Sequence, residues 1–206
     1  MPVRFLVATI IGLSLSAGGQ AQETSGGADA SAVEIAQVRF TTVRDNSGGA
    51  WWRAEVEVRV NASGSGRARF ADRVRVDLSL ATEVTAAEEG FEFYRAGATA
   101  VALESGRWMY RFYLPPAIVR RDRLQGTPRF WLVDATVAGE AVPPSRQSVG
   151  PGFSNAAALQ NFRSKLAQRA PSNDGVLRPE FLTLFANPAD EEAPVMLLPA
   201  AFTSEP

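Results

Sequence analysis

The residues of this 206-residue chain that could perform chemistry are its carboxylates, because the sequence contains neither histidine nor cysteine. Without imidazole or thiol groups the chain lacks the usual general base, the cysteine nucleophile, the soft metal ligands and any disulfide. Two carboxylate pairs remain, Glu55/Glu57 and Glu88/Glu89, and paired carboxylates can hydrolyse a glycosidic bond. Glu55 and Glu57, however, fall on the polar face of a predicted strand, where cross-strand ion pairs are the ordinary arrangement. We therefore expect no catalytic residue.

Calcium is the metal ion that this composition still permits, because it is bound by oxygen alone. Asp45, Asn46 and the acidic run at 190–192 supply oxygens, but the spacing of a calcium-binding loop is missing. The glycine-rich stretch Gly64-Ser-Gly66 lacks the lysine and the following helix of a phosphate-binding loop. The sequence therefore predicts no metal and no cofactor.

Two groups of side chains could serve binding instead of catalysis. Three aromatic residues fall on strand faces opposite the main apolar rows, and solvent-facing aromatic rings can bind a sugar or a partner strand. The alternative is that the C-terminal helix or tail covers these faces. A cluster of arginines between two predicted strands could bind an acidic partner, with a solvated loop as the alternative. The candidate interaction residues are Trp51, Tyr113, Phe130, Arg120, Arg121 and Arg123.

The elements that must position these residues follow a hydrophobic period of two. In the clearest case, 51–60, Trp52, Val56 and Val58 share one face while charged residues alternate with them. Similar stretches recur every ten to twenty residues or so, separated by turn residues, which is typical of an antiparallel sandwich or barrel. We predict a mainly β fold, an immunoglobulin-like sandwich of about seven antiparallel strands. A phase change between Ile35 and Val38 predicts a bulge or strand break.

The period changes after residue 145. Asn155 can cap a helix over 156–169, whose apolar stripe is Leu159, Phe162 and Leu166. An isolated helix of this length is unstable in water, so we expect the stripe to pack on the sandwich or on a partner. The proline-bounded apolar segments that follow indicate an extended tail that lies over the core, or an exposed docking peptide.

The N-terminus resembles an export signal. Arg4 precedes an apolar run that is too short to span a bilayer, and small residues follow up to Ala21. We predict a signal peptide over 1–21, with an uncleaved anchor as the alternative, and no transmembrane segment in the mature chain. The expected organisation beyond it is a flexible linker, a sandwich domain and a helix with a proline-rich tail: 22–32, 33–145 and 146–206. A formal charge of −1 gives no field that would attract nucleic acid.

The chain also resembles a known family in four short stretches: Val33–Val38, Trp51–Arg53, Arg107–Tyr113 and Phe130–Val133. The family consists of exported, immunoglobulin-like, pilus-associated proteins of Verrucomicrobia. The resemblance implies a non-catalytic interaction protein of the periplasm or cell surface, with a protein partner in the cell envelope, serving a type IV pilus or secretion assembly. It assigns no functional residue. The alternative is a carbohydrate-binding module, or a glycan-acting enzyme, that uses the exposed aromatic rings and carboxylates.

Overall fold

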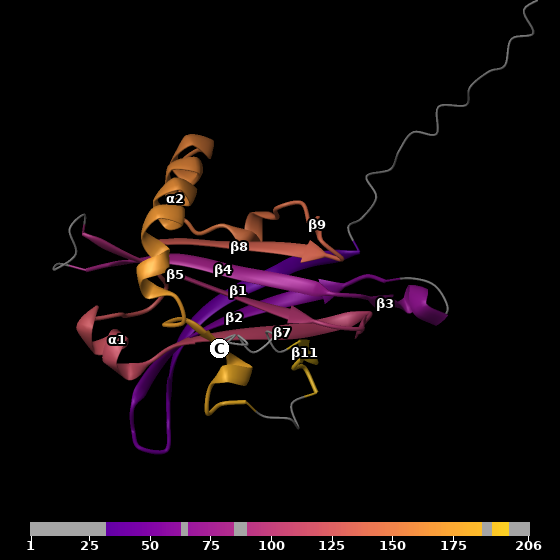
Figure 1. Cartoon of the computed structure of the whole chain (residues 1–206), viewed down its shortest axis with the longest axis horizontal. Coiled ribbons are helices and arrows are strands. Elements are labelled where there is room, and N and C mark those ends of the chain that lie inside the picture. The colour runs from indigo at the N-terminus through magenta and orange to yellow at the C-terminus, as the bar shows by residue number, and fades with distance from the viewer. Residues whose placement is uncertain (1–31, 63–65, 85–89, 187–190, 198–206) are drawn as a thin grey trace, which may run out of the picture.

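The computed structural model describes residues 32–62, 66–84, 90–186 and 191–197. The predicted signal segment, nearly all of the predicted linker, and the Glu88/Glu89 pair lie outside the described residues. Two antiparallel sheets pack face to face (Figure 1), which confirms the predicted sandwich.

The first sheet has four strands in the order β1-β2-β7-β10. They are β1 (Val33–Arg44), β2 (Ala50–Val60), β7 (Gly106–Leu114) and β10 (Arg178–Pro179). The second sheet has five strands in the order β11-β5-β4-β8-β9. They are β11 (Met196–Leu197), β5 (Phe91–Ala100), β4 (Val74–Glu83), β8 (Phe130–Val137) and β9 (Glu140–Ala141). A separate short pair consists of β3 (Phe70–Ala71) and β6 (Leu103–Glu104).

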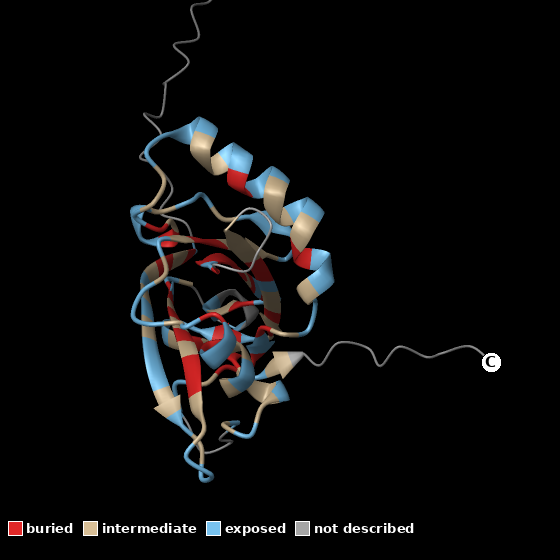
Figure 2. Cartoon of the chain, turned by 90° about the vertical axis from the view of Figure 1, so that its left-hand side faces the viewer, coloured by how far each residue is buried: buried red, intermediate tan, exposed pale blue. Residues whose placement is uncertain are grey.

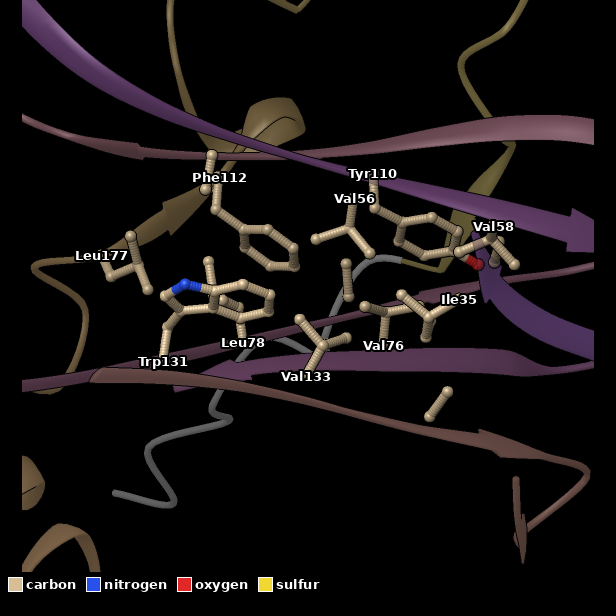
Figure 3. Packing of buried hydrophobic residues seen from close by; sticks show 14 of the residues in the cluster. Ile35, Val56, Val58, Val76, Leu78, Tyr110, Phe112, Trp131, Val133 and Leu177 are labelled. Atoms are coloured by element: carbon tan, nitrogen blue, oxygen red, sulfur yellow. The ribbon is translucent and has the colours of Figure 1, made fainter. Parts of the chain in front are cut away.

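The core lies between the two sheets and contains the apolar rows that the period of two predicts. Val56 and Val58 of β2 are fully buried, as is Leu78 of β4 in the opposite sheet. Figure 3 shows Val56 and Phe112 of one sheet facing Leu78 and Val133 of the other. Burial of such side chains contributes roughly 1.5–3 kcal/mol each, so this interior can replace the disulfides that the chain lacks. The register of β1 on β2 shifts between Ile35 and Gln37, which confirms the predicted irregularity.

A short helix between β7 and β8 was not expected from the sequence. Pro115-Pro116 ends the strand as predicted, but the chain then forms α1 (Pro116–Arg121). Proline is well suited to the first helical turn, because the N–H that it lacks has no partner there and its φ is already helical. Val119 anchors α1 in the core, and two arginines of the predicted loop, Arg120 and Arg121, occupy its last turn, where the helix dipole favours cations.

The second helix, α2 (Ala156–Arg169), has the predicted bounds and the predicted cap: Asn155 accepts a hydrogen bond from the N–H of Ala158 at 2.8 Å. It lies against the outer face of the five-stranded sheet, with its one buried residue, Phe162, in a second apolar cluster (Figure 2). No helix of the described residues is long and apolar enough to cross a membrane. Short 3₁₀ turns complete the structure: η1 (Gly66–Arg69), η2 (Arg146–Ser148), η3 (Ala170–Asn173) and η4 (Glu180–Leu182).

The segment after α2 contributes a strand to each sheet. β10 pairs with β7 through Arg178 and Pro179, and β11 pairs with β5 through Met196 and Leu197. The tail therefore runs along the side of the sandwich where β7 and β5 would otherwise be edge strands. Pairing of an edge with a short strand limits its exposure to other chains.

Candidate functional site

The sheet face that carries Trp51 and Tyr113 does not expose them to solvent. Trp51 is 8% exposed and Tyr113 is 1% exposed, so the expectation of solvent-facing rings is wrong for both. Phe185 of the tail stacks on Tyr113 with ring centroids 4.7 Å apart and an interplanar angle of 8°. The same ring meets Trp51 edge-on at 5.5 Å. The alternative holds here: the C-terminal tail covers this face, and no open aromatic surface remains for a sugar at these two residues.

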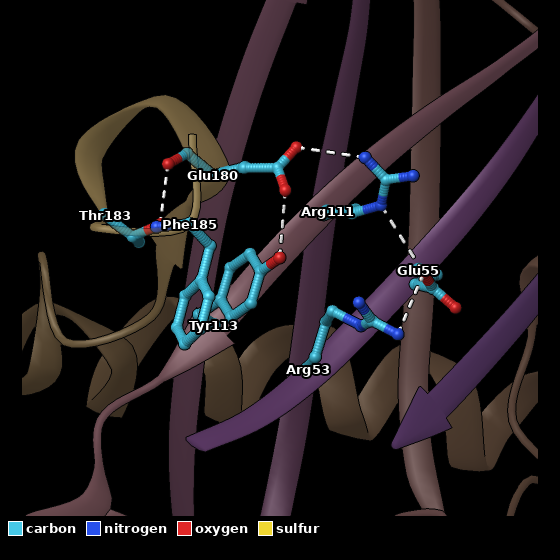
Figure 4. Close-up of polar contacts among 7 residues, drawn as sticks. All are labelled: Arg53, Glu55, Arg111, Tyr113, Glu180, Thr183 and Phe185. Atoms are coloured by element: carbon cyan, nitrogen blue, oxygen red, sulfur yellow. Dashed lines mark hydrogen bonds and ion pairs between the residues drawn. The ribbon is translucent and has the colours of Figure 1, made fainter. Parts of the chain in front are cut away.

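Polar groups hold the tail on this face as well (Figure 4). Glu180 accepts a hydrogen bond from the Tyr113 hydroxyl at 2.9 Å and one from Nη1 of Arg111 at 3.2 Å. Arg111 also donates through Nε to Glu55 at 3.4 Å, and Arg53 lies 3.3 Å from the same carboxylate. Glu55 therefore has two arginine partners, the ion pairing that its strand position predicts. Its carboxylate forms ion pairs with arginines of β2 and β7, the arrangement expected of a structural rather than an acid–base residue.

The environment of Tyr113 keeps its phenol protonated. Burial raises the pKa of Tyr113 first, and the negative charge of Glu180 raises it further. The hydroxyl thus remains a hydrogen-bond donor throughout the physiological range. This side chain serves to bind the tail.

The carboxylate of the β1–β2 turn, one of the oxygen groups considered above for calcium, organises the turn itself. Asp45 accepts hydrogen bonds from the hydroxyl and N–H of Ser47, the N–H of Gly49 and the indole N–H of Trp51, at 2.6–2.9 Å. These donors lower the pKa of Asp45 from 3.8 to about 2, with the Ser47 hydroxyl as the largest cause. The carboxylate organises the hairpin turn, and the described residues hold no group of three or more acids suited to a metal.

Three other candidate residues do meet at one place, an open cavity of about 1010 Å³ at the end of the sandwich. It is bounded by the end of β4, the start of β5 and the segment from α1 to β8. Arg121, Arg123 and Phe130 all line it, together with Arg129. Arg120 lies in the last turn of α1 and is exposed, but it does not line the cavity. The structure thus brings half of the candidate set together and leaves the other half elsewhere.

A buried carboxylate, which no sequence pattern singles out, fixes the walls of this cavity. The side chain of Asp122 has no exposed surface, and it accepts a hydrogen bond from the Tyr94 hydroxyl and one from Nε of Arg121 at 2.5 Å. Nη2 of Arg121 reaches the Tyr94 oxygen at 2.7 Å, and Thr82 lies 3.5 Å from the carboxylate. Burial, followed by the bond to Asp122, raises the pKa of Tyr94. The bond to Asp122 raises the pKa of Arg121.

Aromatic contacts fix the opposite wall. Phe130 is partly buried, and its ring meets Phe91 edge-on at 5.6 Å and Phe153 at 5.5 Å. The guanidinium of Arg129 lies 5.2 Å from the centre of the Phe130 ring. Phe130 therefore faces the cavity rather than open solvent, and its ring is partly covered by neighbours of the second apolar cluster.

The lining of this cavity is suited to recognition of a charged partner. Asp122 already accepts hydrogen bonds from Thr82, Tyr94 and Arg121, so its carboxylate oxygens are engaged within the protein. The remaining charged groups that line the cavity are of both signs: Arg123, Arg129, Glu83 and Glu92. Guanidinium groups beside aromatic rings are typical contact residues of protein interfaces.

Comparison with known proteins supports the fold and goes no further. A search of protein families and a search of curated proteins each returned no match to the chain. A solved crystal structure from Akkermansia muciniphila is similar in fold, with a TM-score of 0.60 at 12% sequence identity. The similarity covers 81% of this chain and 93% of that one. The chain therefore resembles, in its fold, a protein of a verrucomicrobial species.

Proposed function

We propose that this chain is an exported, non-catalytic interaction protein of the periplasm or cell surface, whose end cavity contacts a protein of the cell envelope. The observation that carries the proposal is the construction of that cavity. Asp122 and Tyr94 hold one wall and the Phe130 contacts hold the other, so the arginines at its rim are presented on a rigid frame. A preorganised surface loses little conformational entropy when a partner binds.

We further propose that the partner belongs to a type IV pilus or secretion assembly. Two observations support this assignment. The N-terminal sequence has the character of an export signal, and the fold is shared with a protein of Akkermansia muciniphila, in agreement with the verrucomicrobial family that the chain resembles.

Affinity purification after crosslinking in the native cell envelope tests both parts. The tagged chain is compared with Arg123→Gln/Arg129→Gln, which removes two rim charges, and with Arg107→Gln/Arg146→Gln, which removes two exposed arginines outside the cavity. We expect an assembly component to be recovered with the unaltered chain and the control, and to be reduced about tenfold with the cavity variant.

Two results would overturn the proposal. Recovery of polysaccharide without any assembly component would favour the carbohydrate-binding alternative. Equal recovery of the assembly component with the cavity variant and the control would remove the end cavity as the contact surface.

A further inference from the structure

A second groove lies between the edge of β5 and the tail residues 175–182. It has a volume of about 710 Å³ and is separate from the end cavity, with which it shares no lining residue. None of the described residues that line it is Asp or Glu. We call it the arginine groove after its four charged lining residues: Arg73, Arg75, Arg95 and Arg178.

Two of these arginines are held in place by carboxylates that do not themselves line the groove. Arg75 bonds Asp77 through Nε and Nη2 at 2.7 and 2.6 Å, and Arg95 bonds Asp174 through the same two nitrogens at 2.9 and 3.1 Å. Such two-point contacts fix the plane of each guanidinium. In both cases Nη1 does not take part in the pair, so it can donate to a ligand.

The other two arginines have no carboxylate partner among the described residues. Arg178 donates only through Nε, to the carbonyl of Gly175 at 3.1 Å. Arg73 has a φ of 50°, a left-handed conformation that costs a non-glycine residue energy and is concentrated at functional positions. The groove therefore has an excess of positive charge, although the chain as a whole has a formal charge of −1.

Gly97 makes room for this arrangement. A Cβ atom at Gly97 would lie 2.2 Å from Oδ1 of Asp77 and 2.6 Å from Nη2 of Arg75. Only the absence of a side chain lets that ion pair lie across the neighbouring strand, at the floor of the groove. The position of Arg75 thus depends on a residue that has no charge.

The apolar side of the groove indicates what kind of anion fits. Leu177 and Phe181 line it, and Leu182 is 51% exposed at its rim. A ligand for this groove therefore carries apolar side chains as well as negative charge, which is the character of an acidic peptide and not of a sulfated sugar.

The strand edge beside the groove favours an extended peptide. The N–H of Val101 donates to Val195 at this edge, and main-chain groups of alternate residues point the same way. The main-chain groups of Arg95 and Gly97 therefore also point toward this edge. Among the described residues, β11 pairs with β5 only at Thr99 and Ala100, so no strand pairs with Arg95 or Gly97 on this side. Main-chain groups at a sheet edge recognise extended peptides.

We propose that the arginine groove binds an extended acidic peptide segment of a partner protein, with its carboxylates on the four arginines and its apolar side chains against Phe181 and Leu182. This second contact is independent of the end cavity. Its failure would leave the proposed function at that cavity intact.

Fluorescence anisotropy with the full chain tests the proposal. The probe is a fluorescein-labelled peptide with the repeat Glu-Leu-Glu-Ser, and the matched probe has Lys in place of Glu. The test variant, Arg73→Gln/Arg178→Gln, removes the two arginines that have no carboxylate partner among the described residues, so it breaks no ion pair there. The control variant, Arg107→Gln/Arg146→Gln, changes the net charge equally at exposed sites outside the groove.

We expect the acidic probe to bind, the Lys probe not to bind, and the Kd to rise about tenfold in the test variant and to stay unchanged in the control. Gly97→Ala, which alters no charge, should weaken binding by displacing the Arg75–Asp77 pair. Unfolding midpoints of all variants establish that each is folded. Equal binding by the test and control variants overturns the proposal.

Competition experiments test the alternative ligands of the groove: a sulfated sugar, the chain's own C-terminal residues and a second copy of the chain. A heparin hexasaccharide that displaces the probe at lower concentration than the unlabelled acidic peptide would make the groove a polyanion site and overturn the peptide assignment. Displacement by a synthetic peptide of the chain's own residues 198–206 at equal concentration would do the same, as would self-association of the chain in place of probe binding.

Discussion

Phe185 stacks on Tyr113 almost parallel, at 4.7 Å between ring centroids, although 72 positions separate them in the sequence. The contact joins the C-terminal tail to the outer face of the four-stranded sheet, where Glu180 and Arg111 add polar bonds. The tail is thus an integral part of the fold. Its removal would uncover Trp51 and Tyr113, the two rings that would otherwise form an exposed aromatic surface.

Replacement of Phe185 by alanine should therefore release part of the tail. We expect Phe185→Ala to lower the free energy of unfolding by about 1–2 kcal/mol, because two aromatic contacts are lost from a half-buried ring. Trp51 should also become more accessible to a quencher of indole fluorescence. The matched control is Leu184→Ala, since Leu184 is 61% exposed, and it should change neither urea unfolding nor quenching. Equal effects of the two variants would contradict this role for Phe185.

Tyr113 and Glu180 should be energetically coupled through the hydrogen bond between them. A double-mutant cycle with Tyr113→Phe and Glu180→Ala should give a coupling energy of about 1 kcal/mol, because both groups are shielded from water. The matched cycle is the exposed pair Glu34–Arg59, whose side chains are 44% and 50% exposed, and we expect a coupling below about 0.5 kcal/mol there. Urea unfolding of the seven proteins, the unaltered chain and three variants for each cycle, gives both values, and similar coupling energies for the two pairs would contradict the expectation.

Glu180 should also influence the titration of Tyr113. Burial is the larger cause of the raised pKa of Tyr113, and Glu180 is the next. Glu180→Ala should therefore lower this pKa without returning it to the ordinary value of 10. Tyrosinate absorbance across an alkaline titration measures the change, with Tyr113→Phe to identify the signal. If the pKa of Tyr113 is the same in Glu180→Ala, then burial alone raises it and the charge of Glu180 does not contribute.

The repeating part of the fold could be predicted from the sequence, because local geometry determines it. The alternation through Val56 and Val58 marks a half-buried strand wherever that strand lies. The cap at Asn155 and the stripe through Phe162 define a helix from neighbouring residues alone. Pro116 shows the limit of such rules, since proline both ends a strand and begins a helix.

The candidate site could be predicted only in part, because its contacts join distant segments. A period of two places Trp51 and Tyr113 on the outer face of a sheet, but it does not show whether another segment covers that face. The covering residue, Phe185, lies in a stretch without periodicity. Likewise Asp122 meets Tyr94 across 28 positions, and an acid that stands between basic residues in the sequence resembles any other surface loop residue.

The two Arg–Asp pairs at Asp122 and Asp134 should differ in their contribution to stability. Both have short bonds, but the Asp122 carboxylate has no exposed surface, whereas Asp134 and its partner Arg163 are 42% and 43% exposed. Asp122→Ala leaves the Tyr94 hydroxyl without its acceptor and should lower the free energy of unfolding by about 3 kcal/mol. Asp134→Ala should cost less than about 1 kcal/mol. Equilibrium urea unfolding measures both, and equal losses would contradict a structural role for Asp122.

The turn carboxylate Asp45 should make stability depend on pH in an acidic window. Its pKa is about 2 in the folded chain against 3.8 for the free side chain, so the ionised form is favoured by folding. Its contribution is therefore complete above pH 3.8 and is lost as the pH falls through about 2. The difference in thermal midpoint between the unaltered chain and Asp45→Asn should be constant near neutral pH and shrink across that window. Trp51→Phe, which removes one of the donors to Asp45, should produce a smaller change of the same sign. A difference that persists to pH 2 would contradict this role.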